Sequence, residues 1–258
     1  RRTGPARRGA DLRVASRFIT LAILVVAADP ALAARFHVQP GGTRTAGASL
    51  PGDWTPANCY ATVAAATIAA QPQDSVLCDH ATHVVDSVVD VDVALLGNRD
   101  LSERPSGTIL AVATDGVLAI AGDQPVVLRG LTVAGDGLLR TTPGVVAEAP
   151  AVDLRVEGCR FSGFRTEQTW WFGEGGGAMR VSAAGHLTVV ATRFEDNVCL
   201  GRGGALFLGS GLQAEFDGCV WRDNASAYGT GPLGGAVMVD AGAVHSSVRF
   251  GDCEWRDN

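Results

Sequence analysis

Short apolar runs alternate with turn residues along most of this chain, and no window sustains the 3.6-residue apolar period of a helix. Residues 179–181, 206–208 and 237–239 are three such runs, and each follows a Gly-Gly-Ala triplet. The runs are short, rich in β-branched residues and bounded by Gly, Ser, Asp and Asn. This pattern predicts short strands joined by tight turns.

One phrase recurs through residues 159–258: a small residue, an aromatic residue two positions later, and usually an Asn three positions after the aromatic. The aromatic positions lie 33 (161 to 194), 27 (194 to 221) and 34 (221 to 255) residues apart. A repeat of this length is typical of stacked supersecondary units. The marked residues are Phe161, Phe194, Trp221 and Trp255, then Asn197, Asn224 and Asn258, with Phe164 at the Asn position of the first repeat.

Short strands repeating about every 30 residues describe an all-β solenoid, the right-handed parallel β-helix. Adjacent coils would lie about 4.8 Å apart, so equivalent residues would stack into ladders. We expect stacked Asn side chains to bond to neighbouring amides and aromatic side chains to fill the core. Gly-Gly would allow two backbones to approach closely at a corner, where Ala is small enough to point inward.

The alternation of Gly-Gly-Ala-aliphatic with Phe-x-x-Asn resembles the repeat of the chlamydial polymorphic outer membrane proteins and of bacterial right-handed parallel β-helix repeat proteins. The resemblance covers about 100 of the 258 residues. It departs from the family pattern at Trp221 and Trp255, which replace Phe, and at Phe164, which replaces Asn. It implies an exported cell-surface or secreted protein with a structural, adhesion or ligand-binding role.

The phrase stops at Asn258, where the next Gly-Gly-Ala would follow. We therefore expect the β-helix to be incomplete at the C-terminus and to continue in further coils. Any attachment to a membrane is expected to come through a C-terminal anchor beyond that point.

Residues 1–33 have the pattern of a secretory signal peptide. Six arginines precede an apolar run at 18–28, and Ala31-Leu32-Ala33 is a small-x-small cleavage site. The run is shorter than the roughly 20 residues that span a bilayer. We expect export, to the extracellular space or the cell outer membrane; the alternative is a buried N-terminal helix. Residues 34–58, rich in Gly, Pro, Thr and Ser, predict an extended lead-in.

The β-helix itself is expected over residues 59–258. The Ala-rich stretch 60–70 is the one plausible helix, and Pro72 ends it. Followed by a strand at 74–78, it resembles the N-terminal cap of many pectate-lyase-like β-helices, which implies a helix that covers the open end of the core. Further strand-like runs are 84–96, 108–113, 117–120, 126–133 and 152–156.

Cysteine residues occur six times, and two of them, Cys59 and Cys78, flank the predicted cap. In an exported protein these two are a disulfide candidate, against the alternative of two separate buried thiols. Cys159, Cys219 and Cys253 share one position of the repeat and are expected to pack in the core as small apolar residues.

The charge of the chain limits its partners. Outside residues 1–33, 15 arginines stand against 25 acidic residues, a net charge of about −10. An acidic body argues against nucleic acid and anionic membrane surfaces as partners. Surface glycans, or proteins of a host or neighbouring cell, are the partners that we expect.

Two features could bind a ligand. Trp170, Trp171 and Phe172 lie in the longest variable segment, where they would stack on sugar rings, grip a partner or fold back over a turn. Acidic residues beside the Asn ladder, such as Asp196 and Asp223, could bind Ca²⁺, although the intervening arginines favour a solvated turn. We expect no other cofactor, and the absence of Cys-x-x-Cys argues against structural zinc.

No catalytic cluster is recognisable, so we name no catalytic residue and favour a protein that is not an enzyme. The alternative is a polysaccharide lyase or glycoside hydrolase of the pectate-lyase-like class. Glycosidases need two carboxylates at a defined separation. Asp90 and Asp92 are close in sequence, but their spacing only places them on one strand face, and His186 stands alone after Gly185.

Overall fold

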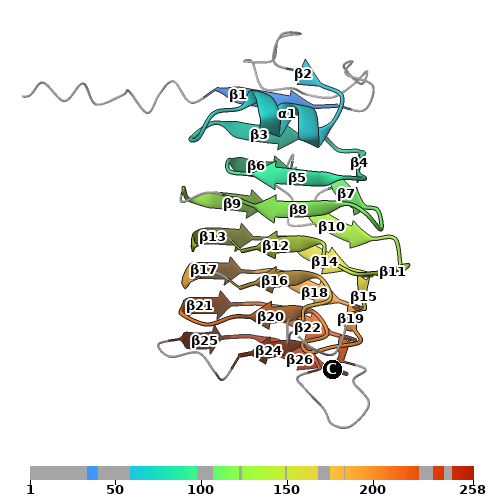
Figure 1. Ribbon diagram of the computed structural model, residues 1–258, viewed down its shortest axis with the longest axis vertical. Helices are drawn as coiled ribbons and strands as arrows, with labels where there is room; N and C mark the ends of the chain where they lie inside the picture. The colour runs from blue at the N-terminus through green and yellow to red at the C-terminus, as the bar shows by residue number, and fades with distance from the viewer. Residues whose placement is uncertain are drawn as a thin grey trace, which may run out of the picture. The chain divides into compact units, whose positions relative to one another are not determined.

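Four parallel sheets run along the stacked coils of the chain (Figure 1). The computed structural model describes residues 34–39, 59–97, 107–121, 124–148, 150–167, 175–182, 184–226, 235–240 and 246–258. The described residues form an all-β parallel β-helix with one short helix, α1 (Val63–Ala69). The signal-peptide prediction for residues 1–33 lies outside the described residues, as does most of the predicted lead-in.

Neighbouring strands within each sheet are hydrogen-bonded, and the spatial order of the strands differs from their order in the chain. Sheet A contains β2 (Cys59–Tyr60), β1 (Arg35–Val38), β3 (Ser75–Cys78), β6 (Ala94–Gly97), β9 (Val126–Arg129), β13 (Ala151–Glu157), β17 (Ala184–Val190), β21 (Leu212–Asp217) and β25 (Ser247–Gly251). Sheet B contains β26 (Glu254–Arg256), β22 (Val220–Arg222), β18 (Arg193–Glu195), β14 (Arg160–Ser162), β10 (Thr132–Gly135), β7 (Ile109–Val112) and β4 (Thr82–Val85). Sheet C contains β24 (Val237–Val239), β20 (Leu206–Leu208), β16 (Met179–Val181), β12 (Val145–Ala147), β8 (Val117–Ile120) and β5 (Val88–Val91). Sheet D contains β11 (Leu139–Arg140), β15 (Arg165–Thr166), β19 (Val198–Cys199) and β23 (Ala225–Ser226).

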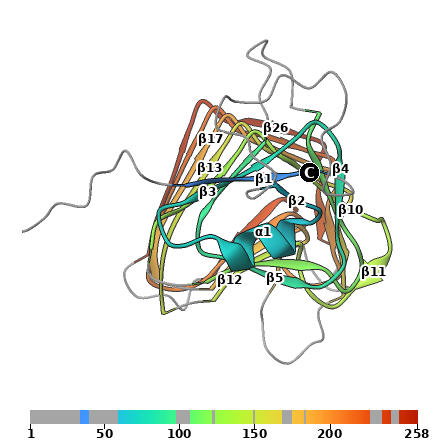
Figure 2. The ribbon, with the colours of Figure 1, turned by 90° about the horizontal axis from the view of Figure 1, so that it is seen from above.

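Each coil takes the chain from sheet A to sheet B and then to sheet C, and from β11 onward a short strand of sheet D is added between B and C. Seen from the end that carries α1, the chain runs clockwise while it moves away from the viewer (Figure 2). The coil is therefore right-handed, the hand that parallel crossover connections adopt almost without exception.

The N-terminal coil contains a strand that the sequence analysis did not single out. Residues 34–58 are predicted to form an extended lead-in, and β1 lies within them and pairs in parallel with both β2 and β3. The apolar run 84–96 also resolves into three strands, because bends at 86–87 and 92–93 send β4, β5 and β6 to three different sheets. Strand pairing between distant segments decides both features.

Helix α1 covers the N-terminal end of the coil, as expected, but it is shorter than the predicted 60–70 (Figure 2). Thr62 begins it, because its Oγ1 accepts a hydrogen bond from the Ala65 N–H at 3.2 Å. Val63 and Ala66 are buried against the first coil, whereas Ile68 is 84% exposed. A short amphipathic helix of seven residues is therefore enough to close this end of the core.

The aromatic residues of the repeat stack in register along the inner face of sheet B. Ring centroids lie 5.1 Å apart for Phe161 and Phe194, 4.2 Å for Phe194 and Trp221, and 5.2 Å for Trp221 and Trp255. Adjacent planes are within 11° of parallel. The first three side chains are fully buried, so this stack is the centre of the core in the C-terminal coils.

The asparagines form a second ladder at the next corner. The Oδ1 of Asn224 accepts hydrogen bonds from both the backbone N–H and the Nδ2 of Asn197, at 3.2 and 3.0 Å. Its Nδ2 donates to the Phe194 carbonyl at 2.8 Å and to the Oδ1 of Asn258 at 2.9 Å. Asn197 and Asn224 are buried, and each side-chain amide bonds to the backbone of the preceding coil and to the Asn side chain of the next one.

Glycine is required where two corners approach closely. A Cβ on Gly204 would lie 2.0 Å from the Gly235 carbonyl oxygen and 2.6 Å from backbone atoms of Ala225. Gly163 differs: it has a φ of +72°, but the same corner of later coils holds Asp196, with a φ of +53°, and other aspartates. A side chain is thus excluded by space at the first corner and accepted at the second.

We predict that Asn224→Ala lowers the free energy of unfolding by about 3 kcal/mol, because four side-chain hydrogen bonds are lost and buried partners stay unsatisfied. Urea denaturation followed by circular dichroism measures the change. Gln213→Ala, on the exposed face of the same coil, is the control and should stay within about 0.5 kcal/mol of the parent. An Asn224→Ala protein as stable as this control would contradict the ladder's role.

We also predict opposite results for two glycine substitutions. Gly204→Ala should destabilise the fold by about 3 kcal/mol or more, because its Cβ meets rigid backbone on two sides. Gly163→Asp should change stability by about 1 kcal/mol or less, since Asp adopts the same positive φ in later coils. Thermal unfolding of the two variants side by side checks this; equal losses would refute the distinction.

Candidate functional site

The outer face of sheet A carries polar side chains in register on successive C-terminal coils. In β13, Val152, Leu154 and Val156 point inward, while Asp153 and Arg155 are exposed. The strands β17 and β21 repeat this alternation in register. We call this surface the sheet A face; it comprises Arg129, Asp153, Arg155, Glu157, His186, Thr188, Gln213, Glu215, Asp217 and Arg249.

Ion pairs join two carboxylates of the sheet A face, Glu157 and Glu215, to arginines. Glu157 accepts a hydrogen bond from the Nε of Arg129 at 2.5 Å and a second one from the Nε of Arg155. Partial burial raises the pKa of Glu157, but the hydrogen bonds and charges of the two arginines outweigh it, so the pKa lies below its usual range. The Nη1 of Arg249 on β25 lies 4.0 Å from the Oε1 of Glu215 on the neighbouring strand β21. Glu157 can therefore bind polar ligands but is a poor proton donor near neutral pH.

His186 has neighbours that the sequence analysis did not recognise. The register of β13 and β17 places His186 beside Asp153, and β21 brings Gln213 to its other side. The signal was present in the sequence, because 33 residues separate Asp153 from His186 just as they separate Phe161 from Phe194. An imidazole between a carboxylate and an amide offers donors and acceptors to a hydroxyl-rich ligand.

A second His–Asp pair lies inside the first coil. The Nε2 of His83 is 3.1 Å from the Oδ1 of Asp79, and both side chains are almost fully buried. Burial raises the pKa of Asp79, and the charge and hydrogen bond of His83 offset only part of this shift. Thr108 also donates its hydroxyl to the Asp79 carbonyl at 2.8 Å. Because both side chains are almost fully buried, although His83 also borders a hollow beside α1, we assign this pair to the structure of the first coil.

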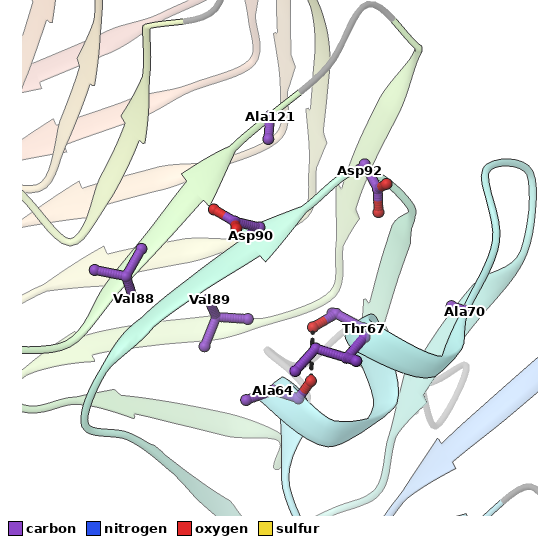
Figure 3. A pocket seen from close by; sticks show the side chains of 9 residues that line it. Ala64, Thr67, Ala70, Val88, Val89, Asp90, Asp92 and Ala121 are labelled. Atoms are coloured by element: carbon purple, nitrogen blue, oxygen red, sulfur yellow. Dashed lines mark hydrogen bonds between the residues drawn. The ribbon is translucent and has the colours of Figure 1, made fainter.

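The carboxylates Asp90 and Asp92 line a hollow of about 450 Å³ between α1 and β5 (Figure 3). Thr67 faces them from the helix, but its hydroxyl donates to the Ala64 carbonyl at 3.1 Å. Asp90 lies in β5 and Asp92 directly follows that strand, with the buried Val91 between them. The structure brings no third titratable side chain of the described residues into this hollow.

The structure gives less information on the other predicted binding residues. Trp170, Trp171 and Phe172 lie outside the described residues. Asp196 and Asp223 occupy corners with positive φ next to the Asn ladder, and the Nε of Arg222 lies 3.3 Å from Asp223. Within the described ranges, no group of three or more His, Cys, Asp or Glu side chains is placed to hold a metal ion. Calcium at this corner therefore gains no support from the geometry.

The expected disulfide between Cys59 and Cys78 is not formed, and both residues are free thiols. They lie in β2 and β3, on either side of β1, with Cys59 opposite His37 and Cys78 opposite Val38. Two strand spacings separate them by roughly 9.6 Å, which is more than a disulfide can bridge. The sequence prediction erred because it did not include β1.

The repeat cysteines pack in the core and bond to backbone carbonyls. Cys159 donates its Sγ–H to the Leu128 carbonyl at 3.5 Å, and Cys219 donates to that of Val189 at 3.5 Å. Thr192 takes the same position in the coil between them and donates its hydroxyl to Val190. Burial raises the pKa of Cys219 to about 12, so its thiol is unreactive at physiological pH.

We predict that iodoacetamide at pH 8 labels the native protein at Cys59 and Cys253 well before the other cysteines. These two are half-buried, whereas Cys78, Cys159, Cys199 and Cys219 are buried. Mass spectrometry of tryptic peptides after timed labelling gives the rates, and labelling in urea is the control in which all six should react. Loss of two thiols in the urea control would instead indicate a disulfide.

Within the described ranges, no helix has the length and apolar character needed to cross a bilayer. Comparison of the chain with protein-family models, with curated proteins and with solved structures found no match.

Proposed function

We propose that this chain is an exported cell-surface or secreted β-helix that recognises a partner through its outer faces and loops, in a structural or adhesion role. Surface glycans are the ligands that the sheet A face suits best, because its side chains offer closely spaced hydrogen-bond donors and acceptors. The repeat phrase, which resembles that of the polymorphic outer membrane proteins, supports the proposal of a surface location.

One observation carries the preference for binding over catalysis. The best-defined carboxylate of the sheet A face, Glu157, is bonded to two arginines that lower its pKa. A general acid for glycoside cleavage needs the opposite shift, a carboxyl group that keeps its proton near neutral pH. Asp79 has a raised pKa, but it lies inside the coil, away from any ligand on the outer face. Glu157 thus suits recognition of a ligand rather than proton donation to it.

The alternative, a polysaccharide lyase or glycoside hydrolase, keeps support from one feature. Asp153 and His186 are neighbours on an exposed sheet, where a base could approach a sugar bound across the coils. Arg155 stands in the next outward position of β13 and could bind a substrate carboxylate. Under this alternative, His186 would be the residue to take a proton.

We predict that the protein binds members of a glycan array without cleaving them. Trp170→Ala/Trp171→Ala and His186→Ala should each weaken binding about tenfold or more, through loss of stacking or of hydrogen bonds. Arg193→Ala, exposed on sheet B, is the matched control and should bind like the parent. The same samples are incubated with acidic and neutral polysaccharides, with and without Ca²⁺, and assayed for new chain ends.

Release of reducing or unsaturated ends that His186→Ala abolishes would replace the binding proposal with the enzymatic one. Neither binding nor cleavage, in a protein whose circular dichroism shows a folded β-helix, would count against glycans as the ligand class.

A further inference from the structure

An apolar patch surrounds the capped end of the coil. Three of its side chains are among the most exposed aliphatic residues of the described chain: Ile68 on α1 is 84% exposed, Val88 on β5 64%, and Val84 on β4 59%. They line two hollows of about 450 and 310 Å³, which share Ala64 and Val89 as common walls. Single exposed aliphatic residues are ordinary, but here three of them lie around two adjoining hollows.

Three carboxylates border this patch. Asp90 and Asp92 line the larger hollow and Asp86 the smaller one. No cation of the described residues lies within ion-pair distance of these three side chains, and no arginine lines either hollow. By contrast, Glu157 and Glu195 elsewhere on the coil are paired with arginines. The three aspartates therefore create a local negative electrostatic potential beside the exposed aliphatic side chains.

We define the cap shoulder as Ile68, Val84, Asp86, Val88, Asp90 and Asp92, and we propose that it binds a peptide segment of a partner protein that carries aliphatic side chains flanked by Lys or Arg. The aliphatic side chains would enter the two hollows and release water from Ile68, Val84 and Val88. The basic side chains would pair with the aspartates, which would orient the segment and speed its association. Figure 3 shows Asp90 and Val88 side by side on β5, so one segment can meet both kinds of group.

The chemistry of the shoulder argues against other occupants. A glycan would find no aromatic platform among the lining residues, and the Thr67 hydroxyl already bonds to Ala64. An anionic membrane surface would be repelled by the aspartates. A second copy of the chain, docked by the same patch in a two-fold contact, would bring like charges together. A basic, aliphatic segment meets none of these objections. This inference is independent of the glycan ligand proposed for the sheet A face.

The test uses the full chain and a fluorescent synthetic peptide of about twelve residues that alternates Leu and Lys, a length that one docked segment would need. Fluorescence anisotropy gives the dissociation constant at low and high salt. Asp90→Asn/Asp92→Asn should weaken binding about tenfold at low salt and remove most of its salt dependence. Ile68→Thr/Val88→Thr should weaken binding about tenfold at both salt concentrations.

The matched control is Leu139→Thr. Leu139 lies on β11 of sheet D, is 50% exposed and has a side chain of the same size as that of Ile68. It should bind the peptide like the parent. All substituted residues are at the surface or half-buried, so unchanged circular dichroism and urea midpoints should accompany every variant.

Three results would overturn the proposal. The first is equal peptide affinity in the parent and both shoulder variants, and the second is equal affinity for a peptide with Ser in place of Leu. The third is a dimer of the parent, seen by light scattering, that Ile68→Thr/Val88→Thr dissociates, because a second copy would then occupy the shoulder. Loss of glycan binding alone would leave this inference standing, since the two assays depend on different residues.

Discussion

In-register stacking of parallel strands is the constraint on which this structure depends. Each inward side chain lies about 4.8 Å from its equivalent in the next coil, so every core position must suit a copy of itself. Aromatic rings meet the constraint by lying parallel, as Phe194 and Trp221 do. Asparagine meets it because its amide both donates and accepts, so that Asn197, Asn224 and Asn258 bond to one another and to the backbone. Lysine or aspartate alone could not form such a column, since like charges would stack.

The Asn ladder ends at Phe164. In the coil before it, a different side chain forms hydrogen bonds to the buried backbone carbonyls of a corner. Arg140 is 2% exposed and donates to the carbonyls of Thr142, Val112 and Gly116. Its guanidinium lies 5.4 Å from the centre of the Phe164 ring. Three backbone acceptors and an aromatic face thus surround a charge that would otherwise be costly to bury. The same need, to pair buried carbonyls at a corner, is met by amides in one part of the coil and by a cation in another.

Because the inner ladders stabilise the coil, the outer faces are free to vary. On sheet B, the nearly buried Glu195 pairs with Arg160 at 2.8 Å, which ties neighbouring coils together. On the sheet A face, Glu157 is likewise held charged by two arginines. At the cap shoulder, by contrast, aspartates and aliphatic residues lie exposed without partners among the described residues. Paired faces contribute to stability, and unpaired ones are available to other molecules.

The sequence by itself determined the all-β class, the parallel coil and the single capping helix, because each coil repeats the same local pattern of turn, aliphatic and aromatic residues. It did not reveal β1 in sheet A, the neighbours of His186, the buried Asp79–His83 pair or the separation of Cys59 from Cys78. These features depend on which residue of one coil lies against which residue of the next. Coils differ in length, so a local pattern gives the register only where a marked repeat residue fixes the offset, as the 33 residues from Phe161 to Phe194 do for His186. Only strand pairing across the tertiary structure decides which polar side chains come together on a face.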